Sequence, residues 1–472
     1  MKELFPEPVL AALRSSPSRP ALEIGSRAVS RGELLAMVRR IAGGLRDAGL
    51  GPGRGVGMVL SLSPEAYAAH LAAHALGCRV AAARPGWSPD QLAHALEGQV
   101  DAVVADVTLD RPVLPLEDLL LGPDHGTLAP GSARPDDIAR LTYTSGSTGQ
   151  PKACAHTYRA MSLAYQPDRW APALARLLSA FERCLINQNL AGPVMFTYLG
   201  RCLVVGGAVV LPDGLAVPEA IERHRVTATL MPPARLHDLL RSRADLSSLR
   251  AVMLGGSPAS PQLLRAATER LGPIVWQGYG QGEAGVISML TPEDIADGHL
   301  ASVGRPLPGV EVTIRHGEIC VRSPHMMAGY WNDPEQTREV VRDGWLHTRD
   351  LGRLDPGGML YLTGRARDVI MVNAEVCYAG AIERVLVTDP QVAQAYVVGA
   401  PDPRTGEAIH AFVVPAGDEA PDRARLLALV RAHLSANSVP RTVTVIADVP
   451  VNASGKPDKG ALRGRTGVIP RA

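Results

Sequence analysis

The sequence predicts an α/β protein with more than one domain. Short apolar segments of strand length alternate with helical segments over residues 21–107, and this alternation implies a parallel sheet with crossover helices. The chain has 472 residues, which is too long for one ordinary core, so we expect two or three domains. Hydrophobic residues make up 46% and charged residues 20% of the chain, as in a soluble globular protein.

The first elements follow from periodicity and stop signals. Apolar residues recur at helical spacing over residues 32–48, and the Gly-Leu-Gly-Pro sequence at 49–52 ends this predicted helix. We expect a buried strand at 56–60, a helix at 64–76 and another strand at 103–107. Together these segments supply the strand and helix alternation of the predicted sheet.

The middle of the chain continues the pattern. Residues 122–137 are rich in Pro, Gly and Ala and predict a loop, and residues 141–143 suit the end of a strand. The segment from residue 153 onward could begin a helix. The apolar run at 204–211 predicts two strands joined by a glycine turn, and 251–254 predicts a buried strand before a tight turn of small residues.

Charge, cysteine content and apolar runs limit the partners and the compartment that we expect. With 48 basic and 47 acidic residues the net charge is +1, which gives no reason to expect nucleic acid or an anionic membrane as partner. The six cysteines are scattered without a Cys-x-x-Cys pair, so free thiols in a reducing cytoplasm are expected. The start of the chain does not look like a secretory signal, and no apolar run approaches the ~20 residues of a membrane helix.

Residues 143–152 predict a polyphosphate-binding loop. Their sequence, Tyr-Thr-Ser-Gly-Ser-Thr-Gly-Gln-Pro-Lys, combines glycines that let backbone N–H groups approach phosphate oxygens with hydroxyl donors and one lysine charge. The spacing Gly-x-x-Gly-x-x-Lys differs from the Walker pattern. A flexible Ser/Gly linker is the alternative, but such linkers rarely end in Pro-Lys between apolar segments. The expected phosphate-binding residues are Thr144, Ser145, Gly146, Ser147, Thr148, Gly149 and Lys152.

From Thr144 to Lys152 the chain resembles the phosphate loop of the adenylate-forming enzymes, which comprise acyl- and aryl-CoA ligases, adenylation domains and luciferases. Later segments resemble the family's other motifs in order, and residues 317–335 look closest to acyl-CoA ligases. The resemblance implies a large N-terminal domain of parallel and mixed sheets with flanking helices, and a small mobile α+β C-terminal domain. It places the ATP- and acid-binding domain at residues 1–366 and the mobile domain at residues 367–472.

The same resemblance assigns a nucleotide site. It implies that Tyr279 stacks on adenine and that Glu283 binds Mg²⁺, a hard cation that carboxylate oxygen suits. It implies that Asp350 accepts both ribose hydroxyls and that Arg365 contacts ribose and phosphate. The remaining residues assigned to the nucleotide are Gly255, Gly256, Ser257, Gln277, Gly278 and Gly280.

Two positions near this site depart from the family pattern. Relatives usually carry Thr before the metal-binding Glu, and this chain has Gly282 there. One hydrogen bond to a charged group, of ~1.5–3 kcal/mol, therefore has to come from elsewhere or be absent. Most relatives have Gly where Arg349 stands.

The segment before residue 204 is implied to form one wall of the acid pocket. Many CoA ligases place a His there and aryl-acid members an Asn, but the matching residues are Leu190 and Ala191, which leaves the acid open. Neighbouring amides either face a polar substrate group or are solvated loop residues, and both interpretations stand at this point. The expected pocket residues are Asn187, Gln188, Asn189, Ala191, Gly192, Gly278 and Gly280.

The last quarter of the chain predicts strands at 392–398 and 410–414 and a helix at 424–434. The resemblance implies a hinge at Arg367, where relatives usually carry Asp or Lys. Lys456, in a loop with Gly beside it, matches the lysine that stabilises the charge developing between the carboxylate and the α-phosphate.

The implied reaction is attack of a carboxylate on the α-phosphorus of ATP·Mg²⁺, which releases pyrophosphate and leaves an acyl adenylate. Positioning and electrostatics supply the catalysis, with Lys456, Glu283 and Arg365 as the catalytic residues. A thiol of CoA, or of the phosphopantetheine on an acyl carrier protein, then takes the acyl group. Thiol-using relatives carry Lys and then Gly after the hinge, where this chain has Met371 and Ala374.

The sequence therefore predicts an acid–thiol ligase for a small aromatic or polar-substituted acid, with a homodimer as one assembly it could form. One alternative is an adenylating enzyme with a non-thiol acceptor, which forms an amide or activates another oxyanion such as nitrite for diazotisation. A second alternative is a catalytically weak binding subunit.

Overall fold

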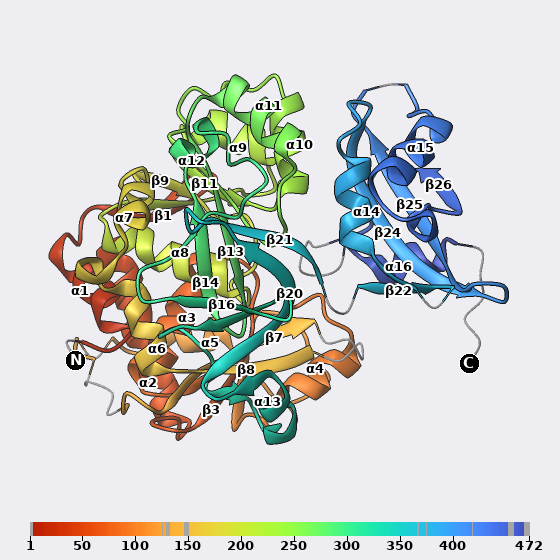
Figure 1. Cartoon of the computed structure of the whole chain (residues 1–472). Coiled ribbons are helices and arrows are strands. Elements are labelled where there is room, and N and C mark those ends of the chain that lie inside the picture. The colour runs from red at the N-terminus through yellow and green to blue at the C-terminus, as the bar shows by residue number, and fades with distance from the viewer. Residues whose placement is uncertain are drawn as a thin grey trace.

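The computed structural model describes residues 3–124, 126–128, 133–145, 151–365, 368–373, 375–417, 419–451 and 457–466. A large body carries three sheets, and a smaller unit with its own sheet lies to one side, drawn in blue in Figure 1. Helices cover the sheets of both parts. The predicted class, a large α/β domain with a small α+β domain after it, is confirmed; the predicted boundary at 366/367 falls on residues outside those described.

The first sheet of the large body carries the predicted phosphate loop. Its order is β18-β8-β7-β4-β3-β5-β6. The strands from β7 to β6 run parallel, whereas β8 and β18 are antiparallel to their neighbours. The strands are β3 (Gly55–Val59), β4 (Arg79–Ala83), β5 (Ala102–Ala105), β6 (Leu114–Pro115), β7 (Ile138–Ser145), β8 (Pro151–Thr157) and β18 (Gly329–Tyr330).

The second sheet has nine strands in the order β15-β14-β13-β12-β11-β9-β10-β1-β2. Its interior strands are parallel, and both edges are antiparallel. Its strands are β1 (Pro20–Ile24), β2 (Arg27–Ser30), β9 (Arg183–Leu185), β10 (Ala208–Leu211), β11 (Ala228–Met231), β12 (Ala251–Leu254), β13 (Val275–Gln281), β14 (Gly285–Leu290) and β15 (Arg305–Pro306).

The main core joins these two sheets. Residues of α2, α3 and α8 pack in one cluster with strands of both sheets. Every residue of α3 except Glu65 is buried, as expected of a helix that is apolar on all sides. The helices of the large body are α1 (Glu7–Ser15), α2 (Arg31–Asp47), α3 (Pro64–Ala75), α4 (Pro89–Leu96), α5 (Leu116–Leu121), α6 (Tyr158–Ser162), η1 (Leu163–Tyr165), η2 (Pro167–Arg169), α7 (Pro172–Ser179), α8 (Pro193–Val204), α9 (Val217–His224), α10 (Pro233–Arg241), α11 (Pro261–Leu271), α12 (Pro292–Ala296) and α13 (Pro334–Val340).

A third, antiparallel sheet completes the large body and leads into the small unit. It consists of β16 (Glu311–Arg315), β17 (Glu318–Arg322), β19 (Val341–Arg342), β20 (Trp345–Leu354) and β21 (Leu360–Arg365). In the small unit α14 and α15 pack on a sheet whose long hairpin is β24–β25. The elements there are β22 (Val369–Val372), β23 (Glu375–Tyr378), α14 (Ala379–Leu386), β24 (Val392–Asp402), β25 (Gly406–Pro415), α15 (Arg423–His433), η3 (Ala436–Ser438), β26 (Thr442–Val445) and α16 (Lys459–Gly464).

Most predicted elements are confirmed. The segments predicted at 32–48, 56–60, 64–76, 103–107, 251–254, 392–398, 410–414 and 424–434 correspond to α2, β3, α3, β5, β12, β24, β25 and α15. The six cysteines are buried free thiols, as predicted. In the part of the chain that is described, no helix combines the length and the apolar character needed to cross a membrane.

Two predictions were wrong. Residues from 153 onward continue strand β8, which pairs with β7 over its whole length, and the helix begins only at Tyr158. Of the two strands predicted at 204–211 only the second exists, as β10, because Val204 ends helix α8 and a turn follows at Gly206. A short apolar run has the same pattern at the end of a buried helix as in a strand, so periodicity could not separate the two.

Candidate active site

The predicted phosphate-loop lysine and the predicted metal ligand meet at the end of the β7–β8 hairpin. Thr144 on β7 lies opposite Lys152 on β8. The Lys152 Nζ atom lies 5.6 Å from the ring centroid of Tyr330, and the Tyr330 hydroxyl donates a 2.8 Å hydrogen bond to Glu283 Oε1. Burial and the Glu283 carboxylate raise the pKa of Tyr330, so its hydroxyl stays protonated as the donor. Tyr330 therefore connects the lysine predicted to bind phosphate with the carboxylate predicted to bind Mg²⁺.

Several predicted site residues lie outside the described part of the chain. They are the loop residues Gly146, Ser147, Thr148 and Gly149, the hinge residue Arg367, Ala374 and the catalytic Lys456. Ser145 is the last residue of β7, opposite Pro151 in the hairpin. The roles assigned to these residues remain predictions.

The structure gives a packing reason for Gly282 before the metal ligand. A Cβ atom at this position would lie 2.5 Å from Cγ2 of Thr144, closer than carbon atoms approach each other. The Gly282 backbone also hydrogen-bonds the ring of His156. A threonine, which relatives usually carry here, therefore does not fit unless the Thr144 side chain rotates or moves.

We expect Gly282→Ala to lower kcat/KM for ATP by about tenfold, because overpacking of this kind costs about 1–3 kcal/mol. The substitution Thr144→Ser removes the clashing methyl group and keeps the hydroxyl. The double variant should therefore recover most of the activity in an ATP–pyrophosphate exchange assay. Equal losses in the single and double variants would show that this contact does not limit position 282.

The predicted ribose carboxylate is held by three side chains. Asp350 is 3% exposed and accepts hydrogen bonds from Tyr279 Oη (2.8 Å), Gln281 Nε2 (2.6 Å) and Arg365 Nε (2.7 Å). Burial and Asp350 raise the pKa of Tyr279, which stays a donor. The structure thus brings together three residues predicted for adenine, ribose and phosphate, and it adds Gln281, which sequence reasoning missed. A carboxylate fixed by donors on both oxygens is preorganised for a ligand.

The loop that presents Asp350 is a bulge in strand β20. Between the pairs Glu318↔Leu351 and Cys320↔His347, β17 advances by two residues while β20 advances by four. The extra residues place Arg349 at a φ of 60°. Glycine adopts this conformation without cost, which explains why relatives use Gly at this position.

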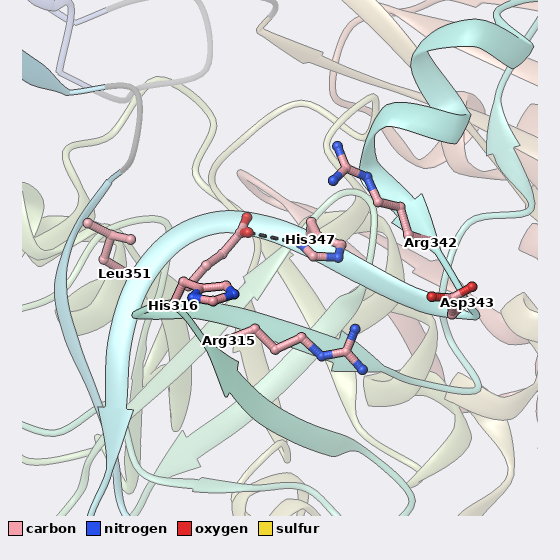
Figure 2. Close-up of a pocket in the computed structure, with 7 residues that line it drawn as sticks. Arg315, His316, Arg342, Asp343, His347 and Leu351 are labelled. Atoms are coloured by element: carbon pink, nitrogen blue, oxygen red, sulfur yellow. Dashed lines mark hydrogen bonds and ion pairs between the residues drawn. The ribbon is translucent and has the colours of Figure 1, made fainter.

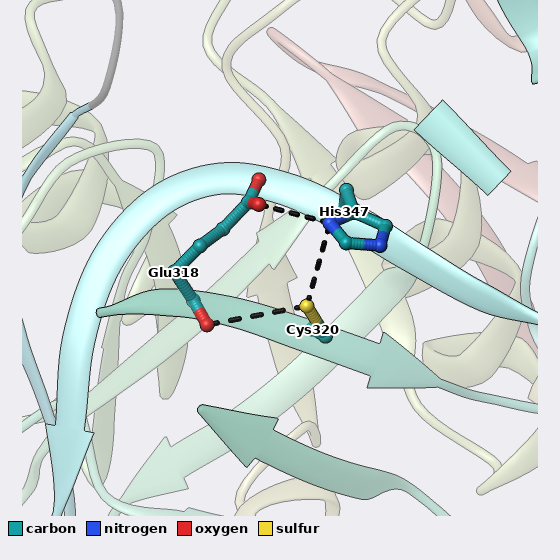
Figure 3. Close-up of side chains that lie close together, drawn as sticks. All are labelled: Glu318, Cys320 and His347. Atoms are coloured by element: carbon teal, nitrogen blue, oxygen red, sulfur yellow. Dashed lines mark hydrogen bonds and ion pairs between the residues drawn. The ribbon is translucent and has the colours of Figure 1, made fainter. Parts of the chain in front are cut away.

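Glu318 anchors this bulge from the neighbouring strand. Its Oε1 atom accepts the Arg349 backbone N–H at 2.8 Å, and its Oε2 atom lies 2.9 Å from His347 Nδ1 (Figure 3). Cys320 Sγ lies 3.6 Å from the same ring nitrogen. A carboxylate oxygen, a thiol sulfur and an imidazole nitrogen, all of which can bind a metal ion, therefore lie within 4.8 Å of one another. Both Glu318 oxygens already hold the loop, and we therefore assign this trio to support of Asp350. Sequence reasoning missed Glu318, since only the strand register brings it to the bulge.

A cavity of about 510 Å³ opens on the outer side of the bulge. Figure 2 shows Arg315, His316, Arg342, Asp343 and His347 around it, with Leu351 at one end. It contains none of the predicted nucleotide or acid residues. The cavity therefore lies behind the ribose loop and not in the predicted nucleotide site.

We expect Arg349→Val to lower stability by about 1–2 kcal/mol, because a β-branched residue is strained at positive φ. Arg349→Gly should stay within about 1 kcal/mol of the parent, since relief of strain offsets the lost ion pair with Glu339 and the added chain entropy. Thermal unfolding midpoints would measure both effects. Arg353→Val, on the same strand without a positive φ, is the control; a loss equal to that of Arg349→Val would remove backbone strain as the cause.

The predicted adenine-side glycines lie on adjoining strand ends. Gly255, Gly256 and Ser257 follow β12, and a Cβ at Gly255 would lie 3.9 Å from the Gly278 carbonyl oxygen. A Cβ at Gly280 would lie 2.3 Å from the Gly285 carbonyl oxygen, so only glycine fits there. Gln277 is 1% exposed, and its amide bonds Ala259 N and Ser302 O. Its side chain therefore serves the fold, and only its backbone remains for a nucleotide.

The predicted wall of the acid pocket is the loop between β9 and α8. Asn189 holds this loop, because its Nδ2 donates to Leu60 O at 2.7 Å and its Oδ1 accepts from Ala191 N at 2.8 Å. Gly192 is the N-cap residue of α8. The buried Asn187 Oδ1 atom has no hydrogen-bond partner among the described residues. Of the three predicted amides, Asn189 is therefore structural, Asn187 keeps an unpaired buried oxygen for a substrate group, and the role of Gln188 remains a prediction.

The large body and the small unit of the chain each match a known protein family model. Residues 10–331 match the family model described as AMP-binding enzyme, and residues 381–456 match the AMP-binding enzyme C-terminal domain. The chain is 33% identical over 495 residues to a feruloyl-CoA synthase of Amycolatopsis sp, covering 96% of this chain and 97% of that protein.

Solved structures give the same result. The amide bond synthetase McbA from Marinactinospora thermotolerans superposes with a TM-score of 0.83 at 36% identity, over 97% of this chain and 98% of that one. The o-succinylbenzoate coenzyme A synthetase MenE from Bacillus subtilis, solved in complex with ATP and magnesium ion, gives a TM-score of 0.82 at 27% identity over 97% and 98%.

Proposed function

Because the chain belongs to the AMP-binding enzyme family, we propose that it activates a small carboxylic acid with ATP and then transfers the acyl group to a thiol. The predicted family and the predicted enzyme class, an AMP-forming ligase, are confirmed by the family match over 10–331 and by the ligases among its relatives. The ligases among the relatives favour an active enzyme over the alternative of a catalytically weak binding subunit.

One observation carries the proposal: Tyr330 contacts both Lys152 and Glu283, so the residues predicted for phosphate and for Mg²⁺ lie in one connected group. Lys152 supplies a fixed positive charge for the phosphates, and Asp350 offers oxygen to the ribose. Three donors already occupy Asp350, so Arg365, whose side chain is 59% exposed, is the partner that can turn toward ribose or phosphate.

The residues present fit a magnesium ion. Glu283 would hold it through carboxylate oxygen, the ligand type that Mg²⁺ prefers, with Tyr330 fixing the carboxylate. When bound, Mg²⁺ neutralises phosphate charge. Lys456, from the loop after β26, is proposed to stabilise the charge that develops as the carboxylate attacks.

We assign the acid to the small aromatic or polar-substituted class. Relatives described as feruloyl-CoA synthase, 2-succinylbenzoate–CoA ligase and 3-hydroxybenzoate–CoA ligase support this class. The acceptor proposed is the thiol of CoA or of the phosphopantetheine arm on a carrier protein. Six unpaired cysteine thiols support a reducing compartment, the cytoplasm, as the place of action.

A second acceptor class, an amine, has one observation in its favour. The chain is 36% identical to an amide bond synthetase, against 33% to the feruloyl-CoA synthase. In this chain Met371 stands on β22 at 41% exposure, where thiol-using relatives carry Lys. An amine acceptor would form an amide from the same acyl adenylate.

The test is acid-dependent pyrophosphate release across a panel of aromatic and aliphatic acids, each with CoA, with an amine or with neither, and with products identified by mass. An acyl-CoA supports the thiol acceptor, and an amide formed in preference moves the assignment to the amine. Glu283→Gln serves as the inactive variant, and Glu293→Gln, a surface acid paired with Arg176, as the matched control. Pyrophosphate release that depends on no acid would overturn the proposal.

A further inference from the structure

Three buried arginines of the large body, Arg31, Arg140 and Arg201, have no carboxylate partner among the described residues. Arg31 bonds two backbone carbonyl groups through Nη1 and Nη2. Arg140 and Arg201 are 3% and 7% exposed, and neither forms an ion pair within the described residues. Each buried acid of the described chain, by contrast, pairs with an arginine. These pairs are Asp294–Arg305, Asp350–Arg365, Asp389–Arg425 and Asp402–Arg441. A buried charge without a counter-charge is costly, so Arg140 and Arg201 are candidates for binding an anion if further contacts bring them to the acid pocket.

Only one of the three side-chain nitrogen atoms of Arg140 has a hydrogen-bond partner among the described residues. Its Nη2 donates to Leu190 O at 2.7 Å, and its guanidinium carbon lies 4.2 Å from the ring centroid of Phe196. Its Nε and Nη1 atoms are enclosed without a hydrogen-bond partner among the described residues. Burial lowers the pKa of Arg140 to about 10, so the group is still a cation at neutral pH. Two N–H-bearing atoms of a buried cation are thus available to an acceptor.

Two histidines join the arginines in one basic cluster, formed by Arg140, His156, Arg201 and His325. His156 lies directly opposite Arg140 on β8. Arg201 Nε donates to Ala164 O at 2.8 Å, and His325 Nδ1 lies 3.4 Å from Ala160 O, so both contact the α6–η1 segment. Burial and a neighbouring arginine lower the pKa of each histidine to about 4. Both rings are therefore neutral at pH 7 and leave two uncompensated arginine charges.

The basic cluster lies on the same sheet face as the predicted phosphate site. Side chains alternate along a strand, so Arg140 and Thr144 of β7 point to one face together with their partners His156 and Lys152 of β8. Four residues of strand separate the two pairs, or about 13 Å. Leu190, whose carbonyl Arg140 holds, belongs to the predicted wall of the acid pocket. The Leu190 contact therefore links Arg140 to the predicted acid pocket, on the sheet face that also carries the predicted phosphate site.

We propose that the acid activated by this enzyme carries a second anionic group, which Arg140 and Arg201 of the basic cluster bind. The substrate class is then an aromatic or unsaturated acid with a second carboxylate, or an equivalent anion, at the far end. A second anion supplies the counter-charge that the described residues lack. This inference rests on the proposed function, because it assumes that an acid occupies the pocket.

The experiment compares matched acids on the full-length protein. Cinnamate, 4-carboxycinnamate and the methyl ester of its para carboxylate differ only in the far group. We expect kcat/KM for pyrophosphate release to be at least about tenfold higher for the diacid than for the other two, as a charge-assisted hydrogen bond predicts. Equal values for all three would overturn the proposal.

Substitutions test whether Arg140 and Arg201 cause the preference for the diacid over cinnamate. Arg140→Met and Arg201→Met keep bulk and remove charge, and each should reduce the ratio of kcat/KM for the diacid to kcat/KM for cinnamate toward 1, whatever the absolute rate on cinnamate. Arg140→Lys should retain part of the preference and guards against misfolding of the Met variant. Arg31→Met is the matched control, because Arg31 is also buried without an ion pair but bonds Ala12 O and Gly207 O elsewhere in the core. Equal losses for cinnamate and the diacid would assign the arginines a purely structural role.

Calorimetric binding separates this inference from the proposed function. Binding of 4-carboxycinnamate that Arg140→Met weakens, without pyrophosphate release from any acid, would retain the anion site and reject the ligase activity. Pyrophosphate release from monoacids alone, with no tighter binding of the diacid, would retain the ligase activity and reject the anion site.

Discussion

Replacing Glu283 with Gln should lower the rate of adenylation by about 100-fold or more and raise the Mg²⁺ concentration needed for half-maximal rate. The amide keeps the shape of the side chain but removes the charge that a hard cation needs. Tyr330 donates to Glu283 Oε1, so the change also converts a charge-assisted hydrogen bond into a neutral one. A Mg²⁺ titration of ATP–pyrophosphate exchange measures both effects.

Tyr330→Phe provides the graded companion to this variant. It removes the hydroxyl that fixes Glu283 and keeps the ring beside Lys152, so we expect a loss of about tenfold to 100-fold, the value of one hydrogen bond to a charged group. Glu293→Gln, at a surface ion pair, should leave the Mg²⁺ dependence unchanged. An unchanged Mg²⁺ requirement in Glu283→Gln would remove this residue from the metal site.

The sequence predicted an element well where apolar residues recur at helical spacing over several turns. Helix α2 carries apolar residues at helical spacing, and the Ser30–Glu33 capping box and the Gly49 stop fix its ends. Strand β8 was not predictable in the same way, because residues 153–157 mix small, polar and apolar side chains and become a strand only by pairing with β7. The pairing of β8 with β7 in the folded protein, and not the local sequence, makes residues 153–157 a strand.

The resemblance predicted those site residues that lie in continuous motifs, such as Tyr279, Glu283 and Asp350. It missed the residues that support them. Gln281 contacts Asp350, Tyr330 contacts Glu283, and each pair is separated by a long stretch of chain. Strand register and hairpin packing create these contacts, and a single sequence does not contain them.

The same reason explains why the basic cluster was not predicted. Arg140 lies four positions before Thr144, in a strand whose other buried residues are apolar or small, and its charge suggested no role next to the hydroxyl-rich loop. Its burial and its missing carboxylate are properties of the packed sheets. Substrate selection in this chain therefore depends on residues outside the motifs that identify the family.

Replacing Lys456 with Met should lower the adenylation rate by about 100-fold to 1,000-fold and leave the ATP dissociation constant nearly unchanged. The lysine is proposed to act only on charge that develops during attack, so its loss affects the reaction and not the bound nucleotide. The described residues on either side of Lys456 contact each other, since Val451 pairs with Pro457 and the Asp458 N–H donates to Pro450 O at 2.7 Å.

Lys459 is the matched control for this variant, because it lies three residues later in the same small unit. Its Nζ atom pairs with Asp368 at 2.7 Å and with Glu383 at 2.9 Å, so it is held within that unit. Lys459→Met should lower the thermal unfolding midpoint and retain most of the rate of pyrophosphate exchange per folded molecule, whereas Lys456→Met should do the reverse. Similar rates for both variants would exclude Lys456 from the reacting centre, and a weakened ATP affinity in Lys456→Met would assign it to ground-state binding instead.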